Sequence, residues 1–426
     1  MLIRQLFYVL PGLYWEKASR EKIERRQTKM MNAFLKNAYE TVPYYKKNKD
    51  YSQELSSVGD IKKIPIINKA AVKKEREAFH SEKYCKPGIT VPLRTSGTTG
   101  EPVIFYHNKS SMDYGTGVNV RKVFATKRYS PFFTTYQITP IPRKKLVFEK
   151  IGLFNRIPVS SHLPIEEMKK IILEKKPKCI VSYPVYFGDL VASMSEEELK
   201  EMRKFIKLIF TESEMLTDHQ RAFISDSLNT EIFDDYGSWE VLNITYECSH
   251  HRHHIAEDRH VLEVLDDEGN PVPDGVEGNI IVSAYLEKAM PLVRYSIGDR
   301  GILNSEPCPC GRTFKTLKLT QGRTDYCIYL ENGTKIYTST LIWLPGIVDG
   351  VREIYIHQDK TRAVTVYYIP LDKEGADNEK IEKFILEYFI ETTGISPQIK
   401  ATDHIPRTKG GKARYVYSEL SEDKGS

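Results

Sequence analysis

The middle of the chain alternates stretches typical of buried strands with stretches typical of amphipathic helices. Residues 179–183 and 205–210 are rich in apolar and β-branched side chains, whereas residues 196–204 and 218–228 have helical patterns. Strands separated by helices usually pair in parallel through crossover connections. We expect this alternation over residues 100–300, which predicts an α/β fold with helices packed on layered sheets.

Residues 261–265 and 278–283 flank a polar turn and are expected to form a β-hairpin.

The last hundred residues predict a second, smaller domain. Beyond a break near residues 322–325, residues 352–356 and 363–369 resemble strands, and residues 379–392 an amphipathic helix. We therefore expect a large N-terminal domain, 1–324, which begins with a helical segment, and a small mobile α+β domain, 325–426.

Length and charge exclude several classes of protein. A chain of 426 residues is too long for one ordinary domain. Its net charge of +5 is a weak reason to expect a nucleic acid partner. The apolar N-terminal stretch is too short for a transmembrane segment and lacks a cleavage site. We expect a cytoplasmic protein whose charged N-terminal helix packs on its own domain, with a helix on a membrane surface as the alternative; the oligomeric state is left open.

A glycine-framed loop of hydroxyl residues favours phosphate binding over a solvated turn. Two glycines allow close backbone approach, and successive N–H groups with three hydroxyls suit an anion. The residues of this loop are Ser96, Gly97, Thr98, Thr99 and Gly100.

Distant segments offer complementary groups. Tyr236 follows the apparent strand 231–233 and suits stacking on a base, while Glu240 suits Mg²⁺. Asp299 follows an expected glycine turn and suits ribose hydroxyls. Arg323 adds a permanent charge, and Lys412, in a glycine-bearing loop, suits a reacting phosphate or carboxylate.

The order of these motifs resembles that of the adenylate-forming acyl-CoA synthetase superfamily. Within it, the chain is most similar to the phenylacetate–CoA ligase branch, which includes ligases associated with capsular polysaccharide and synthetases that adenylylate a deazaflavin. The motifs span most of the chain and lie at residues 95–100, 236–240, 295–299, 322–325 and 406–412.

The resemblance implies roles for individual residues. The hydroxyls of the 96–100 loop would contact phosphates, and Ser213 and Glu214 match the adenine loop of the family. Tyr236 would stack on adenine, with Asp235 and Gly237 beside it in the nucleotide site.

The same resemblance implies the roles of the remaining charged residues. Glu240 would bind Mg²⁺, Asp299 the ribose, and Arg323 the ribose or phosphate. Asp325 would be the hinge of the small domain, and Lys412 would stabilise the charge that develops in adenylation.

Three departures from the family pattern bear on substrate. Trp239 stands where the family usually has Thr or Ser, and Val103 where many members have Lys. Residues 106–159 lack the glycine-rich substrate region of phenylacetate ligases, so phenylacetate is not carried over. Residues 181–187, with Tyr183 and Tyr186, are expected to line an acyl pocket together with Trp239.

Cysteines and histidines predict a metal site. Six cysteines in the chain are too sparse for a disulfide framework. A close Cys308–Cys310 pair and the run from Cys248 to His254 suit either a structural zinc ion or buried thiols with surface histidines. The branch resemblance assigns zinc to Cys248, His254, Cys308 and Cys310, with His250, His251 and His253 as competing ligands.

These observations predict an ATP-dependent, AMP-forming carboxylate ligase. Its partners would be a small carboxylic acid and an acceptor, which is CoA, a carrier-protein thiol or an amine; its cofactors would be ATP, Mg²⁺ and structural Zn²⁺. One alternative transfers AMP to another acceptor such as a deazaflavin. Another is a zinc-stabilised binding protein without catalysis.

Overall fold

The computed structural model divides the chain into two compact units. It describes residues 2–94, 103–139, 147–161, 163–321, 327–331, 335–337, 350–371, 377–406 and 415–420. Unit 1 contains Met1–Phe132, Lys145–Asn155 and Phe233–Thr320, and unit 2 contains Phe133–Lys144, Arg156–Ile232 and Gln321–Ser426. The predicted boundary at 324–325 lies outside the described residues and stays a prediction.

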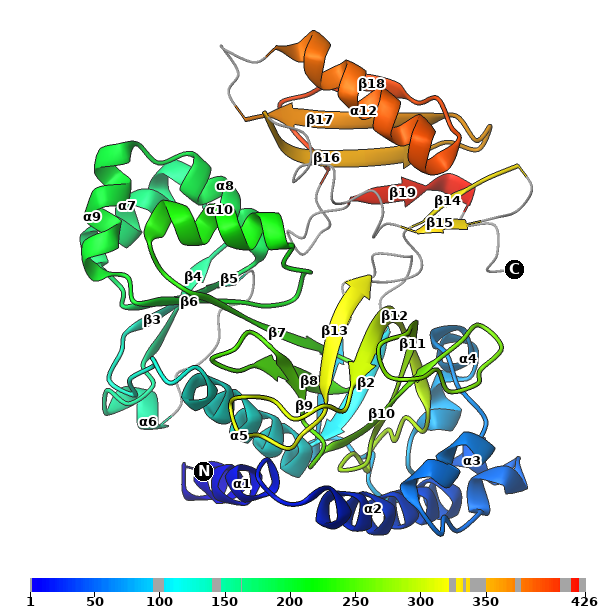
Figure 1. The fold of residues 1–426 in the computed structure, drawn as a ribbon. Coiled ribbons are helices and arrows are strands. Elements are labelled where there is room, and N and C mark those ends of the chain that lie inside the picture. Colours follow the sequence, from blue (N-terminus) through cyan, green and yellow to red (C-terminus); the bar gives the residue numbers. More distant parts are fainter. Residues whose placement is uncertain are drawn as a thin grey trace. The chain divides into compact units, whose positions relative to one another are not determined.

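Helices dominate the N-terminal part of unit 1, as predicted for residues 1–60. Helix α1 packs against α5, and α5 lies across the sheet at β8 (Figure 1). Gly12 allows close packing, because a Cβ there would lie 2.5 Å from the Arg121 guanidinium. The helices are α1 Leu2–Trp15, α2 Arg20–Thr41, α3 Pro43–Lys46, η1 Lys49–Ser52, η2 Val58–Lys63, α4 Lys69–Lys74, η3 Arg76–Phe79, α5 Lys109–Ala125 and α6 Val147–Lys150.

Antiparallel strands form the rest of unit 1. A short pair, β1 (Thr90–Arg94) and β2 (Ile104–Asn108), precedes α5. The larger sheet has the order β10-β11-β12-β13-β9-β8-β7. Its strands are β7 Ile232–Ser238, β8 Leu242–Glu247, β9 His253–Ile255, β10 His260–Leu265, β11 Glu277–Ala284, β12 Tyr295–Asn304 and β13 Thr316–Gln321.

The predicted strand–helix alternation is wrong beyond residue 232. The described residues 233–321 form successive strands with no helix between them. Several connections, such as those between β7 and β8 and between β9 and β10, are only a few residues long, whereas a parallel crossover needs a dozen or more. The predicted hairpin is confirmed, because β10 and β11 pair antiparallel.

Unit 2 contains the predicted α/β alternation. Its parallel strands have the order β6-β5-β3-β4. The expected strand at 205–210 begins later, because Phe205 ends α9, a helix that starts at a capping box of Ser195 and Glu198. The elements are β3 Thr135–Thr139, β4 Arg156–Ser160, α7 Ile165–Lys175, β5 Cys179–Ser182, α8 Pro184–Ala192, α9 Glu196–Phe205, β6 Leu208–Thr211 and α10 Asp218–Leu228.

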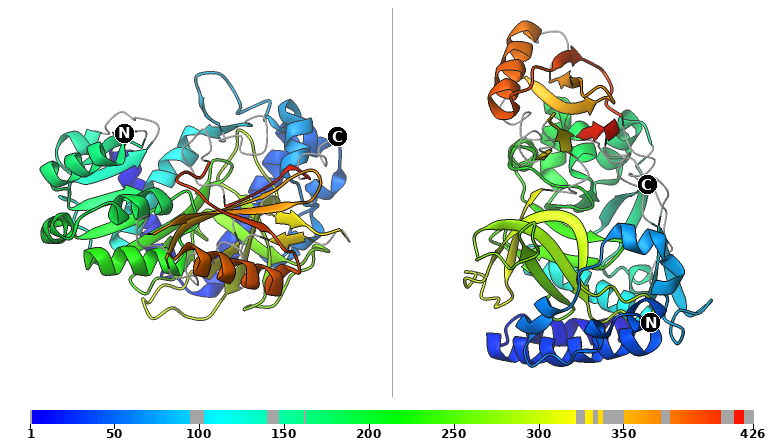
Figure 2. Two further views of the ribbon diagram at one scale, coloured as in Figure 1. Left: turned by 90° about the horizontal axis from the view of Figure 1, so that it is seen from above. Right: turned by 90° about the vertical axis from the view of Figure 1, so that its right-hand side faces the viewer.

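The C-terminal part of unit 2 is the predicted small α+β structure. Helix α12 (Asn378–Thr393) lies on one face of its sheet (Figures 1 and 2). Ile385 and Phe389 of this helix share a buried core with Ile354 and Val366. The sheet has the order β18-β17-β16-β19, with β16 Val351–Gln358, β17 Val364–Pro370, β18 Gln398–Ala401 and β19 Val416–Ser418. Strands β14 (Cys327–Tyr329) and β15 (Lys335–Tyr337) pair antiparallel in a separate two-stranded sheet.

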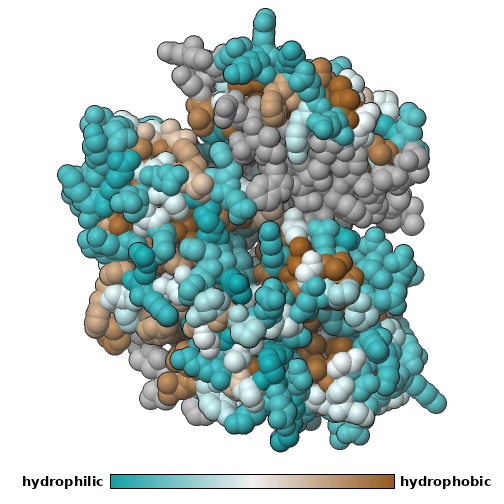
Figure 3. Space-filling view, in the orientation of Figure 1, coloured by the Kyte–Doolittle hydropathy of each residue, from teal (hydrophilic) through white to brown (hydrophobic). Residues whose placement is uncertain are grey.

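The surface drawn in Figure 3 is mostly hydrophilic, with hydrophobic residues in small separate groups. Among the described residues, no helix combines the length and apolar character that crossing a membrane requires.

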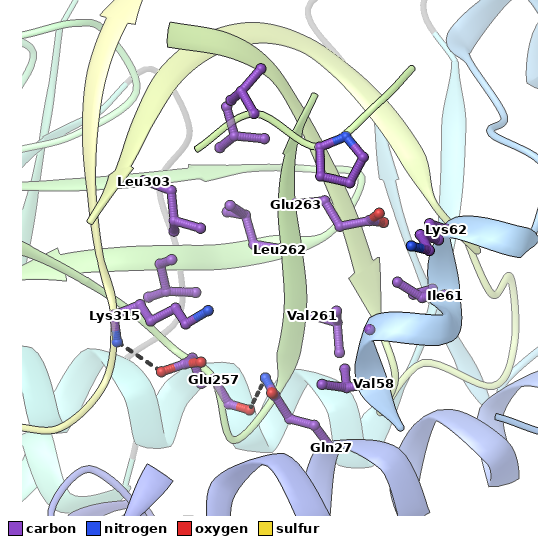
Figure 4. Close-up of a pocket in the computed structure, with 15 residues that line it drawn as sticks. Gln27, Val58, Ile61, Lys62, Glu257, Val261, Leu262, Glu263, Leu303 and Lys315 are labelled. Atoms are coloured by element: carbon purple, nitrogen blue, oxygen red, sulfur yellow. Dashed lines mark hydrogen bonds between the residues drawn. The ribbon is translucent and has the colours of Figure 1, made fainter. Parts of the chain in front are cut away.

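A pocket of ≈ 220 Å³ lies on unit 1 between β10, η2 and α2 (Figure 4). Its carboxylates already have partners. Glu257 accepts hydrogen bonds from the Lys315 backbone and from Arg20, and Glu263 pairs with Arg294. No predicted site residue lines this pocket.

Candidate functional site

The described residues contain part of the predicted nucleotide site. Unit 1 holds Asp235, Tyr236, Gly237, Glu240 and Asp299, and unit 2 holds Ser213 and Glu214. The predicted phosphate loop (Ser96, Gly97, Thr98, Thr99, Gly100), Arg323 and Lys412 lie outside the described residues.

A tight hairpin between β7 and β8 carries Tyr236 and Glu240. The strand register shifts between Tyr236 and Gly237. A Cβ on Gly237 would lie 2.7 Å from the carbonyl oxygen of Leu242, closer than packed atoms allow. Glycine is therefore needed here so that the two strands can approach and present both side chains.

Tyr236 and Asp299 are joined directly. The Tyr236 hydroxyl donates a hydrogen bond of 2.5 Å to Asp299 Oδ2. Asp299 lies within strand β12, so the predicted turn before it is wrong; Gly298 is a left-handed residue inside that strand, with φ 87°. The fold thus brings together two motifs that are 63 residues apart in the sequence.

Asp235 has a different environment from Tyr236. Successive strand residues point to opposite faces, and the Asp235 carboxylate forms a buried ion pair with Lys122 of α5. This pairing was not predicted, although a lysine inside a largely buried helix was a signal for it. A contact between Asp235 and nucleotide stays a prediction.

Glu240 is suited to a cation. The residue is buried, and its Oε2 atom has no hydrogen-bond partner among the described residues. A buried carboxylate oxygen without a partner is costly, and Mg²⁺ prefers such oxygen ligands. The residue therefore fits the metal that the sequence predicts for it.

In unit 2, Ser213 and Glu214 follow β6. Ser213 has a left-handed backbone with φ 73°, a conformation that favours glycine. Burial, together with the charges of Glu212 and Glu214, raises the pKa of Tyr183, so its hydroxyl stays protonated. Burial also raises the pKa of Tyr186 to about 12. The Tyr186 hydroxyl donates to the Leu163 carbonyl, and a contact of either tyrosine with an acyl group stays a prediction.

Cys248, His254, Cys308 and Cys310 form a compact cluster in unit 1. One ligand atom from each lies within 4.8 Å of all the others. Cys248 Sγ is 3.7 Å from Cys308 Sγ, and His254 Nε2 is 3.3 Å from Cys310 Sγ. His254 Nδ1 donates to the Phe314 carbonyl at 2.9 Å, which directs Nε2 toward the sulfurs.

The cluster distinguishes His254 from the neighbouring histidines. His251 and His253 contact the carboxylate of Glu247 instead, and the metal-ligand cluster of the described residues includes His254 alone from the 250–254 run. Three thiols and one imidazole match the donor set of structural zinc sites.

The cluster lowers the pKa of Cys248 and of Cys310 but raises that of Cys308. Burial opposes charge at Cys310, but hydrogen bonds from His254 and Arg312 outweigh it and lower its pKa to about 5. Burial likewise opposes charge on His254, yet the two adjacent sulfurs raise its pKa to about 9. Burial and the neighbouring sulfurs raise the pKa of Cys308 to about 12. A bound cation would relieve this crowding of sulfurs.

Residues around the cluster connect it to the N-terminal helices. Arg312 forms an ion pair with Glu16 at 3.2 Å, and Tyr246 donates to the other oxygen of Glu16 at 2.6 Å. The Thr313 hydroxyl donates to the Ala18 carbonyl at 2.6 Å. The cluster therefore holds the segment between α1 and α2.

The chain is similar along most of its length to a named CoA ligase and to Protein CapK. It is 24% identical over 412 residues to phenylacetate-coenzyme A ligase of Thermus thermophilus, covering 91% of this chain and 88% of that protein. It is also 24% identical over 410 residues to Protein CapK of Staphylococcus aureus, covering 88% of this chain and 86% of CapK. No family-level sequence profile matches the chain.

Solved structures show the same fold. The structure of 2-hydroxyisobutyryl-CoA ligase in the postadenylation state, in complex with 2-HIB-AMP, has a TM-score of 0.78 at 18% identity and covers 95% of this chain and 91% of that chain. An anthranilate CoA ligase in complex with anthranoyl-AMP has a TM-score of 0.54 at 15% identity and covers 76% of this chain and 65% of that chain. The resemblance predicted from the motifs is confirmed: the chain has the fold of the adenylate-forming superfamily and is similar in sequence to its phenylacetate–CoA ligase-like branch.

Proposed function

We propose that this protein is an ATP-dependent, AMP-forming ligase that joins a small carboxylic acid to a thiol, with CoA as the preferred acceptor. A carboxylate oxygen of the acid attacks the α-phosphorus of ATP and pyrophosphate leaves. The acceptor sulfur then attacks the acyl carbonyl and AMP leaves. CoA is preferred over a carrier protein or an amine because phenylacetate-coenzyme A ligases are among the similar proteins.

Tyr236 and Asp299 are proposed to bind the nucleoside. Their hydrogen bond fixes the phenol ring beside a carboxylate, so a base that stacks on the ring brings its ribose hydroxyls to Asp299. Glu240 would hold Mg²⁺, which neutralises charge on the phosphates during transfer.

The proposed nucleotide site also includes residues that lie outside the described ranges. The hydroxyls and backbone N–H groups of residues 96–100 would hold phosphate oxygens, and Arg323 would add a fixed positive charge near the ribose or phosphate. Lys412 would stabilise the charge that develops in adenylation and, on a mobile domain that turns at Asp325, would leave before the thiol arrives.

Zinc is proposed for a structural role only. The four cluster residues would occupy all four tetrahedral positions, so no position remains for water or substrate. The ion would fasten the turn after β8 to the segment between β12 and β13.

The observation that carries this proposal is the hydrogen bond between Tyr236 and Asp299. The same unit buries Glu240, whose Oε2 atom has no hydrogen-bond partner in the described part of the chain. The test is ATP–pyrophosphate exchange with a panel of aromatic, aliphatic and hydroxy acids, followed by mass spectrometry of the product with CoA. We expect acid-dependent exchange and an acyl thioester. A product that carries AMP on a non-acyl acceptor, or ATP binding without exchange across the panel, would refute the proposal.

A further inference from the structure

A buried histidine connects the two parts of unit 1 that are proposed to hold the phosphates and the magnesium ion. His107 lies on β2, the strand that begins just after residues 95–102, and it is 2% exposed. Its Nε2 atom is 2.8 Å from the carbonyl oxygen of Trp239, and its Nδ1 atom is 2.9 Å from Glu287 Oε2. The resemblance to known ligases assigns no role to this residue.

The direction of these hydrogen bonds is set by their partners. A backbone carbonyl only accepts, so Nε2 must carry a proton and donate to Trp239. Glu287 is itself held in place, because its Oε1 atom receives the backbone N–H groups of Asn108, Lys288 and Ala289, each at 3.0 Å, and its Oε2 atom faces Nδ1. The imidazole is thus held between a rigid carboxylate and the turn that contains Trp239.

That turn needs support from outside itself. Leu242, at its end, has φ 64°, a left-handed conformation that is strained for a branched side chain. Gly237, at its start, packs against the Leu242 backbone. A strained segment persists only where surrounding contacts fix it, and the bond from His107 is made to Trp239, the residue directly before Glu240.

We propose that His107 is a positioning residue that sets the geometry of Glu240 relative to strand β2, and so controls how tightly magnesium and ATP bind. The inference rests on the proposed function, because it takes Glu240 as the magnesium ligand. It also accounts for the tolerance of Trp239 in place of the usual threonine or serine, since the turn here is fixed through the backbone carbonyl of residue 239, which does not depend on the side chain.

Two substitutions separate the two bonds of the imidazole. The amide nitrogen of His107→Asn can replace Nδ1 and donate to Glu287, but it is too short to reach Trp239. The longer His107→Gln can place its nitrogen near the position of Nε2 and restore the bond to the turn. His80→Asn is the matched control, because His80 packs on Tyr106 of the same strand.

The experiment measures ATP binding to the full chain by calorimetry at increasing Mg²⁺ concentrations, with thermal unfolding followed for each variant. We expect H107N to raise the Mg²⁺ concentration for half-maximal ATP binding about tenfold, on the scale of outer-sphere partners in metal sites. H107Q is expected to stay within about threefold of wild type, and H80N to match it. If H107N does not fold, Glu287→Gln replaces it in the comparison with H107Q. We expect Glu287→Gln to raise the Mg²⁺ concentration for half-maximal ATP binding more than H107Q does, but less than about tenfold.

The outcomes distinguish this inference from the proposed function. A normal Mg²⁺ requirement in H107N, or equal impairment of H107N and H107Q, overturns the role of His107. Mg²⁺-independent ATP binding by the wild type overturns it as well. Mg²⁺-dependent binding without exchange for any acid overturns the proposed ligase and leaves the positioning role intact.

Discussion

Unit 1 contains two groups of functional residues that differ in how complete they are. The cysteine–histidine cluster is closed, since its four ligand atoms lie within 4.8 Å of one another and all come from one unit. The candidate nucleotide-binding residues form an open site, in which a polar group has no protein partner among the described residues. Tyr236 and Asp299 meet, but Glu240 keeps an oxygen without a hydrogen-bond partner among the described residues.

The difference follows from what each group must do. A structural metal stabilises best when every ligand is preformed and shielded from water. A site for phosphoryl transfer must admit a large substrate and release pyrophosphate, so its charges are expected to converge only when the substrate is bound. Substitutions in the first group should therefore affect stability, and those in the second should affect turnover.

The largest effect is expected from removal of the cluster. Cys310→Ser removes the most acidic thiol, and we expect loss of about one equivalent of zinc and a fall of about 4 kcal/mol in the free energy of unfolding, because loss of a structural metal belongs to the most damaging class of change. The measurements are metal analysis of protein purified without chelator and denaturant unfolding.

Cys85→Ser is the matched control, since Cys85 lies outside the cluster and should retain both metal and stability. Less than about half an equivalent of zinc in the wild-type protein would contradict a structural metal at this cluster.

The second-largest effect is expected from a substitution in the proposed nucleotide site. Lys412→Ala is expected to abolish ATP–pyrophosphate exchange, a loss of at least about 100-fold or about 3 kcal/mol, on the scale of a missing oxyanion donor. Unfolding should be unchanged. Thioester formation from a preformed acyl-adenylate should be largely retained, because the lysine would serve only the first half-reaction.

Lys409→Ala, in the same segment, controls for general loss of positive charge. Exchange at a near wild-type rate in K412A would remove Lys412 from the mechanism. Equal loss in both half-reactions would show instead that the substitution disturbs the whole domain.

Local patterns predicted much of the fold. Helix α10 spans residues 218–228 as predicted, because Thr217 and Gln220 form a capping box that marks its start. Spacing left either a metal site or buried thiols open, and the resemblance to the ligase branch implied the four residues that meet in the cluster. The wrong alternation beyond residue 232 shows the limit of apolar runs, which do not by themselves reveal whether strands pair in parallel or antiparallel.

Contacts between distant segments were not predictable. The bonds between Tyr236 and Asp299, Lys122 and Asp235, and His107 and Glu287 depend on strand register and on helix packing across 63, 113 and 180 residues of sequence. A shift of one residue in a strand would turn each side chain to the opposite face. Motif order therefore identified residues but could not show which of them meet.

The smallest effects are expected from substitutions that change backbone strain at a left-handed residue. Left-handed positions occur beside the cluster in unit 1 at Gly311 (φ 82°) and at the non-glycine residue His251 (φ 52°), and in the predicted adenine loop of unit 2 at Ser213 (φ 73°). Strain at a non-glycine left-handed residue costs about 1 kcal/mol or more, so Ser213→Gly should raise the free energy of unfolding by about 0.5 kcal/mol after the greater freedom of the unfolded chain is counted. It should also weaken ATP binding if the hydroxyl contacts adenine.

Gly311→Ser is the reciprocal change, and it tests backbone strain alone because a Cβ at this position would meet no atom within 4 Å. We expect it to lower the free energy of unfolding by about 1 kcal/mol without changing ATP affinity. Denaturant unfolding and ATP titration of both variants decide the matter. If Ser213→Gly gains stability and loses affinity while Gly311→Ser only loses stability, strain in the open site serves binding. If Ser213→Gly gains stability at full affinity, the serine has no role in the nucleotide site, and the contrast between the two groups rests on metal and charge alone.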